Sequence, residues 1–408
     1  MNYHSNKNSV LWIYFIALLC FAILRNVSFL YLILPPIFAL AIVLRSNFVV
    51  KNKSILFIYI IFIGWTCFVA LFSPIYNPDP DVIYQVPRLF FSILTPLVFC
   101  FVADQKKAAD GAIIIFVACY AIAVFTYIFQ INFGAIEWFS DEPMERGTVL
   151  RYATNLGSGN IYGIGIGSAL LASLLFIKRD VVKFTIVTII LLGAILSMQK
   201  ATIVNVILAF VLYFLVLKKW PSFMMIFSSI VMLIITYVFY IYFPSSVLSI
   251  YILEFINNGF GIDVLGDGSL RRDTVLSEEN LWERFAGIHV ENIFEQHPEM
   301  LISLIGVGIT GAGGGMGLPQ YLQAHSTYWD IFFMGGITYL LIVIALFSAV
   351  QFALWRNKDF MSRFWFFSNI VIFVNMFAAS ALIFHPILSL PLWLSVGWAM
   401  RVTNAKLR

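Results

Sequence analysis

Long apolar runs, separated by short polar segments, recur along the whole chain. Most of these runs are close to the ~20 residues that a membrane-crossing helix needs, so we expect about twelve spans. The expected spans are 9–25, 27–44, 54–72, 88–103, 111–131, 159–177, 184–199, 201–217, 222–243, 326–349, 364–384 and 387–400. The pattern therefore predicts an all-α, polytopic membrane protein whose immediate surroundings are a lipid bilayer.

Composition supports this class and excludes an ordinary soluble domain. Hydrophobic residues make up 61% of the chain and charged residues 11%, whereas soluble domains carry about 25% charged residues. The four cysteines, Cys20, Cys67, Cys100 and Cys119, lie inside apolar runs without paired spacing. They are typical of buried small residues and do not indicate a disulfide framework or a metal site. No nucleic-acid partner is expected.

Basic residues collect in alternate loops, which predicts how the chain is oriented in the membrane. The residues concerned are Arg45, Lys51, Lys53, Lys106, Lys107, Lys178, Arg179, Lys183, Lys218, Lys219, Arg356, Lys358, Arg363, Arg401, Lys406 and Arg408. These loops lie on one side of the membrane if the N-terminus is cytoplasmic. We therefore expect both termini in the cytoplasm and the acidic loops on the outer side.

One outer region is far longer than any inner loop. It covers residues 244–324 and divides the chain into helices before it (1–243), the loop itself and helices after it (325–408). Within the loop, residues 278–297 are predicted to form an amphipathic helix that begins after Ser277 and ends at His297-Pro298. The inner loops are too small for a catalytic domain, so any chemistry is expected at the outer face.

Three cations stand near the predicted outer surface, where the positive-inside bias disfavours them: Arg151, Lys200 and Arg284. One explanation is salt bridging to outer acids such as Glu145 and Glu283. The other is an anion site, because guanidinium is permanently charged and binds phosphate through two parallel hydrogen bonds. The spans themselves are almost free of charge, which argues against an ion-coupled transporter.

His325 follows the long outer loop and immediately precedes the span 326–349. An imidazole with an ordinary pKa near 6.5 suits a general base at neutral pH, and nearby arginines favour its neutral form. The alternative is a helix-entry histidine whose nitrogens bond the loop backbone. His385, before Pro386 in a short outer turn, is a second candidate base without a polar environment in the sequence.

Two further signals are weaker. The glycine-rich run 306–317 lacks the Lys-Ser/Thr pair of a phosphate-binding loop, so we interpret it as a flexible connector or a hinge. Asp79-Pro80-Asp81 has the spacing of paired carboxylates that hold a divalent cation, but it is a lone Asp-x-Asp in a proline-rich loop. We expect no metal and no cofactor.

The segment around His325 resembles the histidine motif of the O-antigen ligase and O-antigen polymerase (Wzy-type) superfamily, with His325-Ser326 followed by Gly336 and Tyr339. Other segments resemble the family's pattern in the same order along the chain. They are Arg151 with Asn160 nine residues later, Ser197–Ala201, and Arg284 with Gln296-His297-Pro298 and Gly306-Val307-Gly308. Two departures from the family's pattern are Gly159, where proline is common, and Lys200, where arginine is usual.

The resemblance implies a GT-C-like membrane fold and a metal-independent, inverting glycosyltransferase. Its site would lie at the outer, periplasmic face of the bacterial inner membrane. It implies His325 as the general base and Arg284 and Arg151 as catalytic cations on the donor diphosphate. We expect Lys200, Asn160, Arg271 and Arg272 to bind substrate.

The implied donor and acceptor are undecaprenyl-diphosphate-linked oligosaccharides, and a chain-length regulator protein is an expected partner. We favour a polymerase of O-antigen or a related surface polysaccharide, because the outer face carries more acid than base. A ligase that transfers glycan to the phosphorylated lipid A core would need basic outer loops, and it remains the alternative. A transporter of lipid-linked sugar is a further alternative from a different class.

Overall fold

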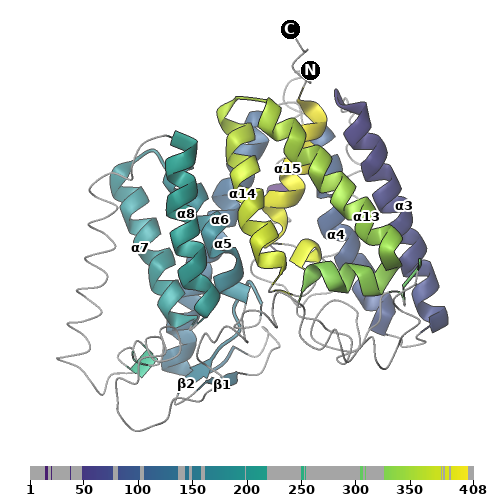
Figure 1. Cartoon of the computed structure of the whole chain (residues 1–408). Helices are drawn as coiled ribbons and strands as arrows, with labels where there is room; N and C mark the ends of the chain where they lie inside the picture. Colours follow the sequence, from purple (N-terminus) through teal and green to yellow (C-terminus); the bar gives the residue numbers. More distant parts are fainter. Residues whose placement is uncertain are drawn as a thin grey trace, which may run out of the picture. The chain divides into compact units, whose positions relative to one another are not determined.

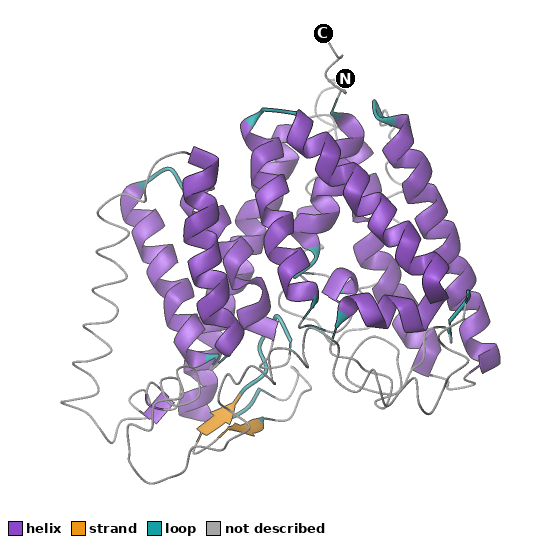
Figure 2. Cartoon of the chain, viewed as in Figure 1, coloured by secondary structure: helices purple, strands orange, loops and turns teal. Residues whose placement is uncertain are grey.

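The computed structural model describes residues 14–16, 20, 37, 48–76, 81–101, 105–136, 143–146, 149–157, 161–197, 199–217, 250–251, 253, 304–306, 308, 326–377, 379, 382–385 and 387–402. For residues 73–76, 81–89, 144–146, 149, 161 and 200 only the backbone is described. Across these ranges the chain is mostly helical, with one short β-hairpin (Figure 2). The predicted helical class is confirmed.

Nine of the predicted spans coincide with a helix in the described part of the chain. The helices are α3 (Lys53–Tyr76), α4 (Asp81–Phe101), α5 (Gln105–Phe133), α6 (Ile161–Phe176), α7 (Asp180–Leu196), α8 (Lys200–Leu217), α13 (Thr327–Arg356), α14 (Phe360–Met376) and α15 (Leu390–Arg401) (Figure 1). Helices α3, α5 and α13 contain segments long and apolar enough to cross a membrane. The spans expected at 9–25, 27–44 and 222–243 lie essentially outside the described residues, so their number stays a prediction.

The structure shows two changes of backbone direction inside expected spans. Helix α14 ends at Met376, although the apolar run continues to 384, and a separate 3-10 turn, η7 (Leu382–Phe384), follows. The backbone N–H of Leu382 bonds the side chain of Thr327 instead of continuing a helix. Helix α13 is broken at Gly336, whose φ of 70° lies in the left-handed region. Hydropathy alone does not register either change of direction.

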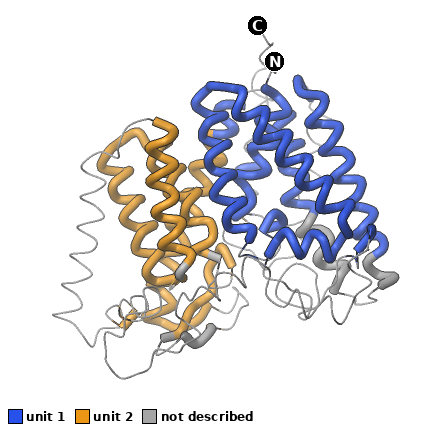
Figure 3. The backbone as a smooth tube through the Cα atoms, viewed as in Figure 1, with its two compact units in different colours: residues 1–17, 27–109, 281–408 blue, residues 18–26, 110–280 orange. Residues whose placement is uncertain are grey.

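The described residues belong to two compact units (Figure 3). Unit 1 comprises residues 1–17, 27–109 and 281–408, and unit 2 comprises residues 18–26 and 110–280. Unit 1 therefore contains α3, α4 and α13–α15, while unit 2 contains most of α5, the hairpin and α6–α8. The three-part division at 243 and 324 follows expected membrane topology and stays a prediction.

In unit 1, the start of α3 and the ends of α4 and α15 meet at one end. The backbone N–H groups of Lys51 and Asn52 both donate to the carbonyl of Met400 at 2.9 Å. Arg401 donates to the carbonyl of Phe99 at 3.1 Å. The indole of Trp398 reaches the hydroxyl of Ser362 at the start of α14, at 3.0 Å. The charge pattern had assigned the basic residues of these helix ends to the cytoplasmic side.

The core of unit 1 is aromatic. Trp393 of α15 packs against Phe62 of α3 and Phe347 of α13, with ring centroids 5.5 and 5.8 Å apart. The buried indole of Trp393 donates a hydrogen bond to the carbonyl of Ile383 in η7 at 2.6 Å. Burial of apolar side chains holds the helices together. Hydrogen bonds from buried polar groups, such as the Trp393 indole, fix the connecting turns against the helices.

In unit 2, small residues let helices approach closely around Tyr162. Its hydroxyl donates to the carbonyl of Ile190 in α7 at 2.9 Å. Gly193, one turn further along α7, has no room for a Cβ atom, which would collide with the Tyr162 hydroxyl. Helix α8 packs along α6, where Asn205 donates to the carbonyl of Gly163 at 2.8 Å.

Candidate functional site

Arg151 is the predicted site residue whose side chain the structure describes. It ends strand β2 (Val149–Arg151), which pairs antiparallel with β1 (Met144–Arg146), so that Arg151 lies opposite Met144. Its exposed fraction is only 5%, which is unusual for an arginine. The hydroxyl of Tyr251 donates to the carbonyl of Leu150, and burial raises the pKa of Tyr251, so this hydroxyl keeps its proton. The guanidinium of Arg151 is thus buried, and it is carried by a strand whose register is fixed.

Gln130, near the end of α5, connects that helix to the segment after Arg151. Its amide nitrogen donates to the carbonyl of Ala153 at 2.7 Å, and its amide oxygen accepts from the N–H of Ile136 at 3.0 Å. Asn155 donates to the carbonyl of Cys119 in the same helix at 3.1 Å. These buried amides satisfy backbone groups that have no regular secondary structure of their own. They attach the backbone after Arg151 to α5 at two positions along the helix, Cys119 and Gln130.

A series of contacts runs from Arg151 to the start of α8. Tyr127 on α5 lies near Arg151, and its ring packs edge-on against Tyr162 with ring centroids 5.8 Å apart. Gly163, the next residue of α6, lies directly against the side chains of Gln199 and Thr202. The backbone of Lys200 stands between these two residues. Arg151 and the start of α8 therefore lie at the same end of unit 2.

In unit 1, the residues next to His325 are firmly anchored. Ser326 and Thr327 are both buried at the start of α13. The hydroxyl of Thr327 donates to the carbonyl of Ala379 and accepts from the N–H of Leu382 at 2.9 Å. Ser326 reaches the carbonyl of Met376 at 3.4 Å. The entry to α13 is held by the turn between α14 and η7, at the end of unit 1 opposite the C-terminal end of α15 (Figure 1).

The break in α13 receives the start of the glycine-rich run. Gly306 and Gly308 have positive φ angles of 74° and 82°, and the N–H of Gly308 donates to the carbonyl of Met334 at 2.9 Å. A Cβ on Gly306 would meet backbone atoms of 333–335, and one on Gly336 would collide with Leu304. Gly306 and Gly308, the two described glycines of the run, thus lie against the backbone of α13, and the interpretation of the run as a flexible connector or a hinge stays a prediction. The remainder of the run lies outside the described residues.

Tyr339 of the histidine motif also has structural partners, as does Gly335, which directly precedes the motif's Gly336. The indole of Trp65 donates to the carbonyl of Gly335 at 3.1 Å. The hydroxyl of Tyr339 pairs with that of Thr66 at 2.8 Å, while its ring stacks on Phe62. Gly335, which directly precedes the motif's Gly336, and Tyr339 of the motif thus attach the bent helix α13 to α3.

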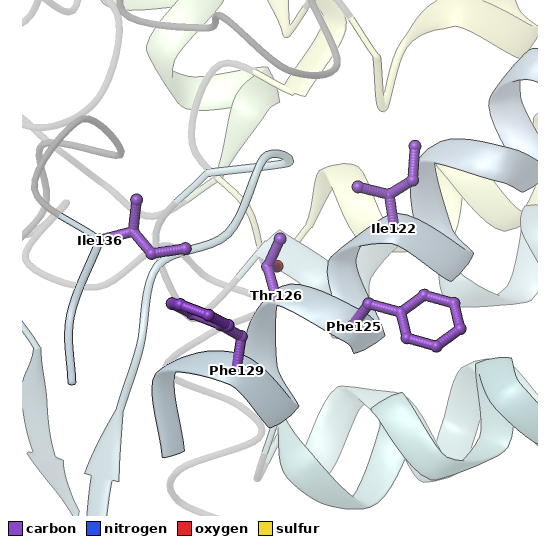
Figure 4. A pocket seen from close by; sticks show the side chains of 5 residues that line it. All are labelled: Ile122, Phe125, Thr126, Phe129 and Ile136. Atoms are coloured by element: carbon purple, nitrogen blue, oxygen red, sulfur yellow. The ribbon is translucent and has the colours of Figure 1, made fainter. Parts of the chain in front are cut away.

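An open apolar recess of about 350 Å³ lies on unit 2 (Figure 4), and Ile136 in its lining donates its backbone N–H to the side chain of Gln130. Its lining residues are Ile122, Phe125, Thr126, Phe129 and Ile136. Phe125 and Phe129 remain 59% and 50% exposed. The recess offers apolar contact, and the hydroxyl of Thr126 in its lining already donates to the carbonyl of Ala123.

The other predicted site residues are placed only in part. Lys200 opens α8, but its side chain is not described. His325, Arg284, Asn160, Arg271 and Arg272 lie outside the described residues, as does the whole amphipathic segment predicted at 278–297. Their convergence with Arg151 therefore stays a prediction.

His385, the second candidate base, is a buried turn residue. Its Nδ1 accepts from the backbone N–H groups of Ile387 and Leu388, at 3.3 and 3.1 Å. These bonds require an Nδ1 lone pair and so favour the neutral tautomer that carries its proton on Nε2. This geometry assigns His385 a part in shaping the turn before α15.

Sequence reasoning missed Gln130, Tyr127 and Thr327. Gln130 was detectable in principle, because it is an amide near the end of an otherwise apolar run. Tyr127 gave no such signal among 18 tyrosines and 41 phenylalanines. Thr327 is adjacent to the histidine motif, but its role depends on residues more than fifty positions away.

No protein-family model matches this chain, and no curated protein matches it.

Proposed function

We propose that this protein polymerises undecaprenyl-diphosphate-linked oligosaccharide units into O-antigen or a related surface polysaccharide. The observation that carries the proposal is Arg151, a guanidinium that is 5% exposed at the same end of a helical unit as the start of α8. A buried guanidinium with a permanent positive charge suits the binding of the diphosphate of a lipid-linked donor. The ordered resemblance of the four sequence segments adds the glycosyl-transfer chemistry.

The proposed architecture is that of a GT-C-like enzyme with about twelve membrane helices. It lies in the bacterial cytoplasmic membrane, with its large loop in the periplasm. Three helices long and apolar enough to cross a membrane support the membrane setting. In unit 1, Lys51 and Arg401, two of the basic residues assigned to the inner side, lie at one end. The start of α13, next in sequence to His325, lies at the other.

In the proposed reaction, a hydroxyl oxygen of the acceptor sugar attacks the anomeric carbon of the donor. The bond from that carbon to the diphosphate oxygen breaks, and the diphosphate leaves with the electron pair. Arg151 and Arg284 stabilise the growing negative charge with help from Lys200, and His325 accepts the hydroxyl proton. Asn160, Arg271 and Arg272 contact the substrate, and no metal or cofactor takes part.

Deletion of the gene in its native host, followed by analysis of surface glycan, tests the proposal. Polymerase function predicts lipid A core that bears a single repeat unit, and a plasmid copy restores long chains. Long chains that remain on undecaprenyl, together with lipid A core that bears no glycan, would instead identify a ligase. Unaltered polymer length with His325→Ala would contradict the enzymatic proposal and favour a transporter.

A further inference from the structure

Three buried tyrosines form a small cluster inside unit 2. The ring of Tyr162 lies between those of Tyr120 and Tyr127, with centroid distances of 5.2 and 5.8 Å. All three side chains are at most 1% exposed. The hydroxyl of Tyr162 bonds the carbonyl of Ile190. Among the described residues, the hydroxyls of Tyr120 and Tyr127 have no hydrogen-bond partner.

A buried hydroxyl without a partner is unfavourable, because it loses its hydrogen bonds to water and gains none in return. Phenylalanine would fill the same space without this cost. A tyrosine at such a position therefore points to a ligand or a bound water that completes its hydrogen bonding. The two tyrosines differ in their surroundings, and this difference separates the two explanations.

Tyr127 faces the arginine site. It lies one turn before Gln130 on α5, so both side chains share a face of the helix. Gln130 in turn holds Ala153, two residues after Arg151. Tyr127 lies near Arg151, whereas the ring of Tyr120 contacts Phe116 and Tyr162. Tyr120 lies two turns deeper along the helix.

We propose that the Tyr127 hydroxyl donates a hydrogen bond to the same diphosphate oxygens that Arg151 binds. This inference rests on the proposed function, since it concerns the donor site. Arg151 supplies permanent charge, and Tyr127 supplies a neutral, oriented donor from a rigid helix. A neutral donor strengthens anion binding in a dry site without adding a second buried charge. Tyr127 would thereby favour a diphosphate over an uncharged lipid.

The experiment measures ligand binding to the purified full-length protein in nanodiscs. The probes are undecaprenyl diphosphate, undecaprenol and inorganic pyrophosphate. The variants are Tyr127→Phe and, as a matched control, Tyr120→Phe, each of which removes one unpartnered hydroxyl from the same helix. Thermal unfolding should be unchanged or slightly raised for both variants, because no hydrogen bond within the described part of the protein is lost.

We expect Tyr127→Phe to weaken undecaprenyl diphosphate binding on the order of tenfold or more, as for hydrogen bonds to charged groups. Tyr120→Phe should bind like the wild type, and undecaprenol should not distinguish the three proteins. In an Arg151→Ala background, Tyr127→Phe should have a smaller further effect, because the two residues hold one anion. The same Tyr127 dependence for pyrophosphate would identify the diphosphate as the recognised group.

Equal affinities for the wild type, Tyr127→Phe and Tyr120→Phe would overturn this inference while leaving the proposed function standing. Equal losses in the two variants would also overturn it, because they would indicate a general effect on packing or on a bound water. If the wild type fails to bind undecaprenyl diphosphate, the donor site assigned under the proposed function is wrong, and this inference falls with it.

Discussion

The side chain of Gln130 donates to the carbonyl of Ala153 at 2.7 Å and so joins α5 to a segment 23 residues away along the chain. The same amide accepts the N–H of Ile136 at 3.0 Å. One buried side chain therefore orients the backbone on both sides of the β-hairpin that carries Arg151. Loss of this side chain affects the position of the guanidinium without removing it.

Gln130→Leu should reduce polymer formation strongly, although the protein still folds. The substitution leaves the buried carbonyl of Ala153 without its partner, at about 1–3 kcal/mol, and also removes the acceptor of the part-buried N–H of Ile136. Asn132→Ala is the matched control, since the Asn132 amide is exposed and bonds only the carbonyl of Ile128 in its own helix. Glycan length in complemented cells and thermal unfolding in detergent measure the two effects. Equal activity of the two variants would show that Gln130 does not position the site.

Gly336→Ala should destabilise unit 1 by more than about 1 kcal/mol, because L-residues are disfavoured at positive φ. The added Cβ would also collide with Leu304. Gly64→Ala in α3 is the control. A Cβ there meets nothing within 4 Å, and alanine is the better helix former. Thermal unfolding of both variants checks this pair, and a Gly336→Ala protein as stable as Gly64→Ala would contradict the role of the break.

Helix positions were predictable from the sequence because apolar runs report burial or lipid contact directly. The end of α14 was not, since residues 377–384 remain apolar while Leu382 bonds Thr327. Hydropathy reports whether a side chain prefers water or an apolar environment. It carries no information about which acceptor a backbone N–H bonds. The break at Gly336 has the same origin, because the docking of Leu304 and Gly306 becomes evident only in three dimensions.

The candidate site was predictable where charge conflicts with location. Arg151 was identified because cations are disfavoured at the outer surface, but its burial was not foreseen. The partners that hold its backbone, Gln130 and Asn155, lie on opposite sides of it in the sequence. Their contacts depend on the return of the hairpin to α5, a long-range relation that no local pattern encodes.

Thr327→Val should disturb the residue next to His325 at almost constant volume. The substitution removes the acceptor of the Leu382 N–H and the donor to the Ala379 carbonyl, with an expected loss of about 1–3 kcal/mol in stability. We also expect shorter polymer, because the entry to α13 loses its anchor. Thr185→Val is the control, since the exposed Thr185 hydroxyl bonds only Val181 within α7. Wild-type polymer length in Thr327→Val would argue against a positioning role.

Arg151 separates an arginine mechanism from a metal mechanism. Arg151→Ala should reduce transfer by an amount that corresponds to about 2–4 kcal/mol of barrier, as for loss of a charge-stabilising donor. Arg151→Lys should recover only part of the activity, because an ammonium keeps the charge but not the two parallel hydrogen bonds. In reconstituted membranes the wild type should keep its activity in EDTA. Inhibition by EDTA, reversed by a divalent cation, would instead implicate the carboxylates of Asp79 and Asp81 in metal-assisted transfer.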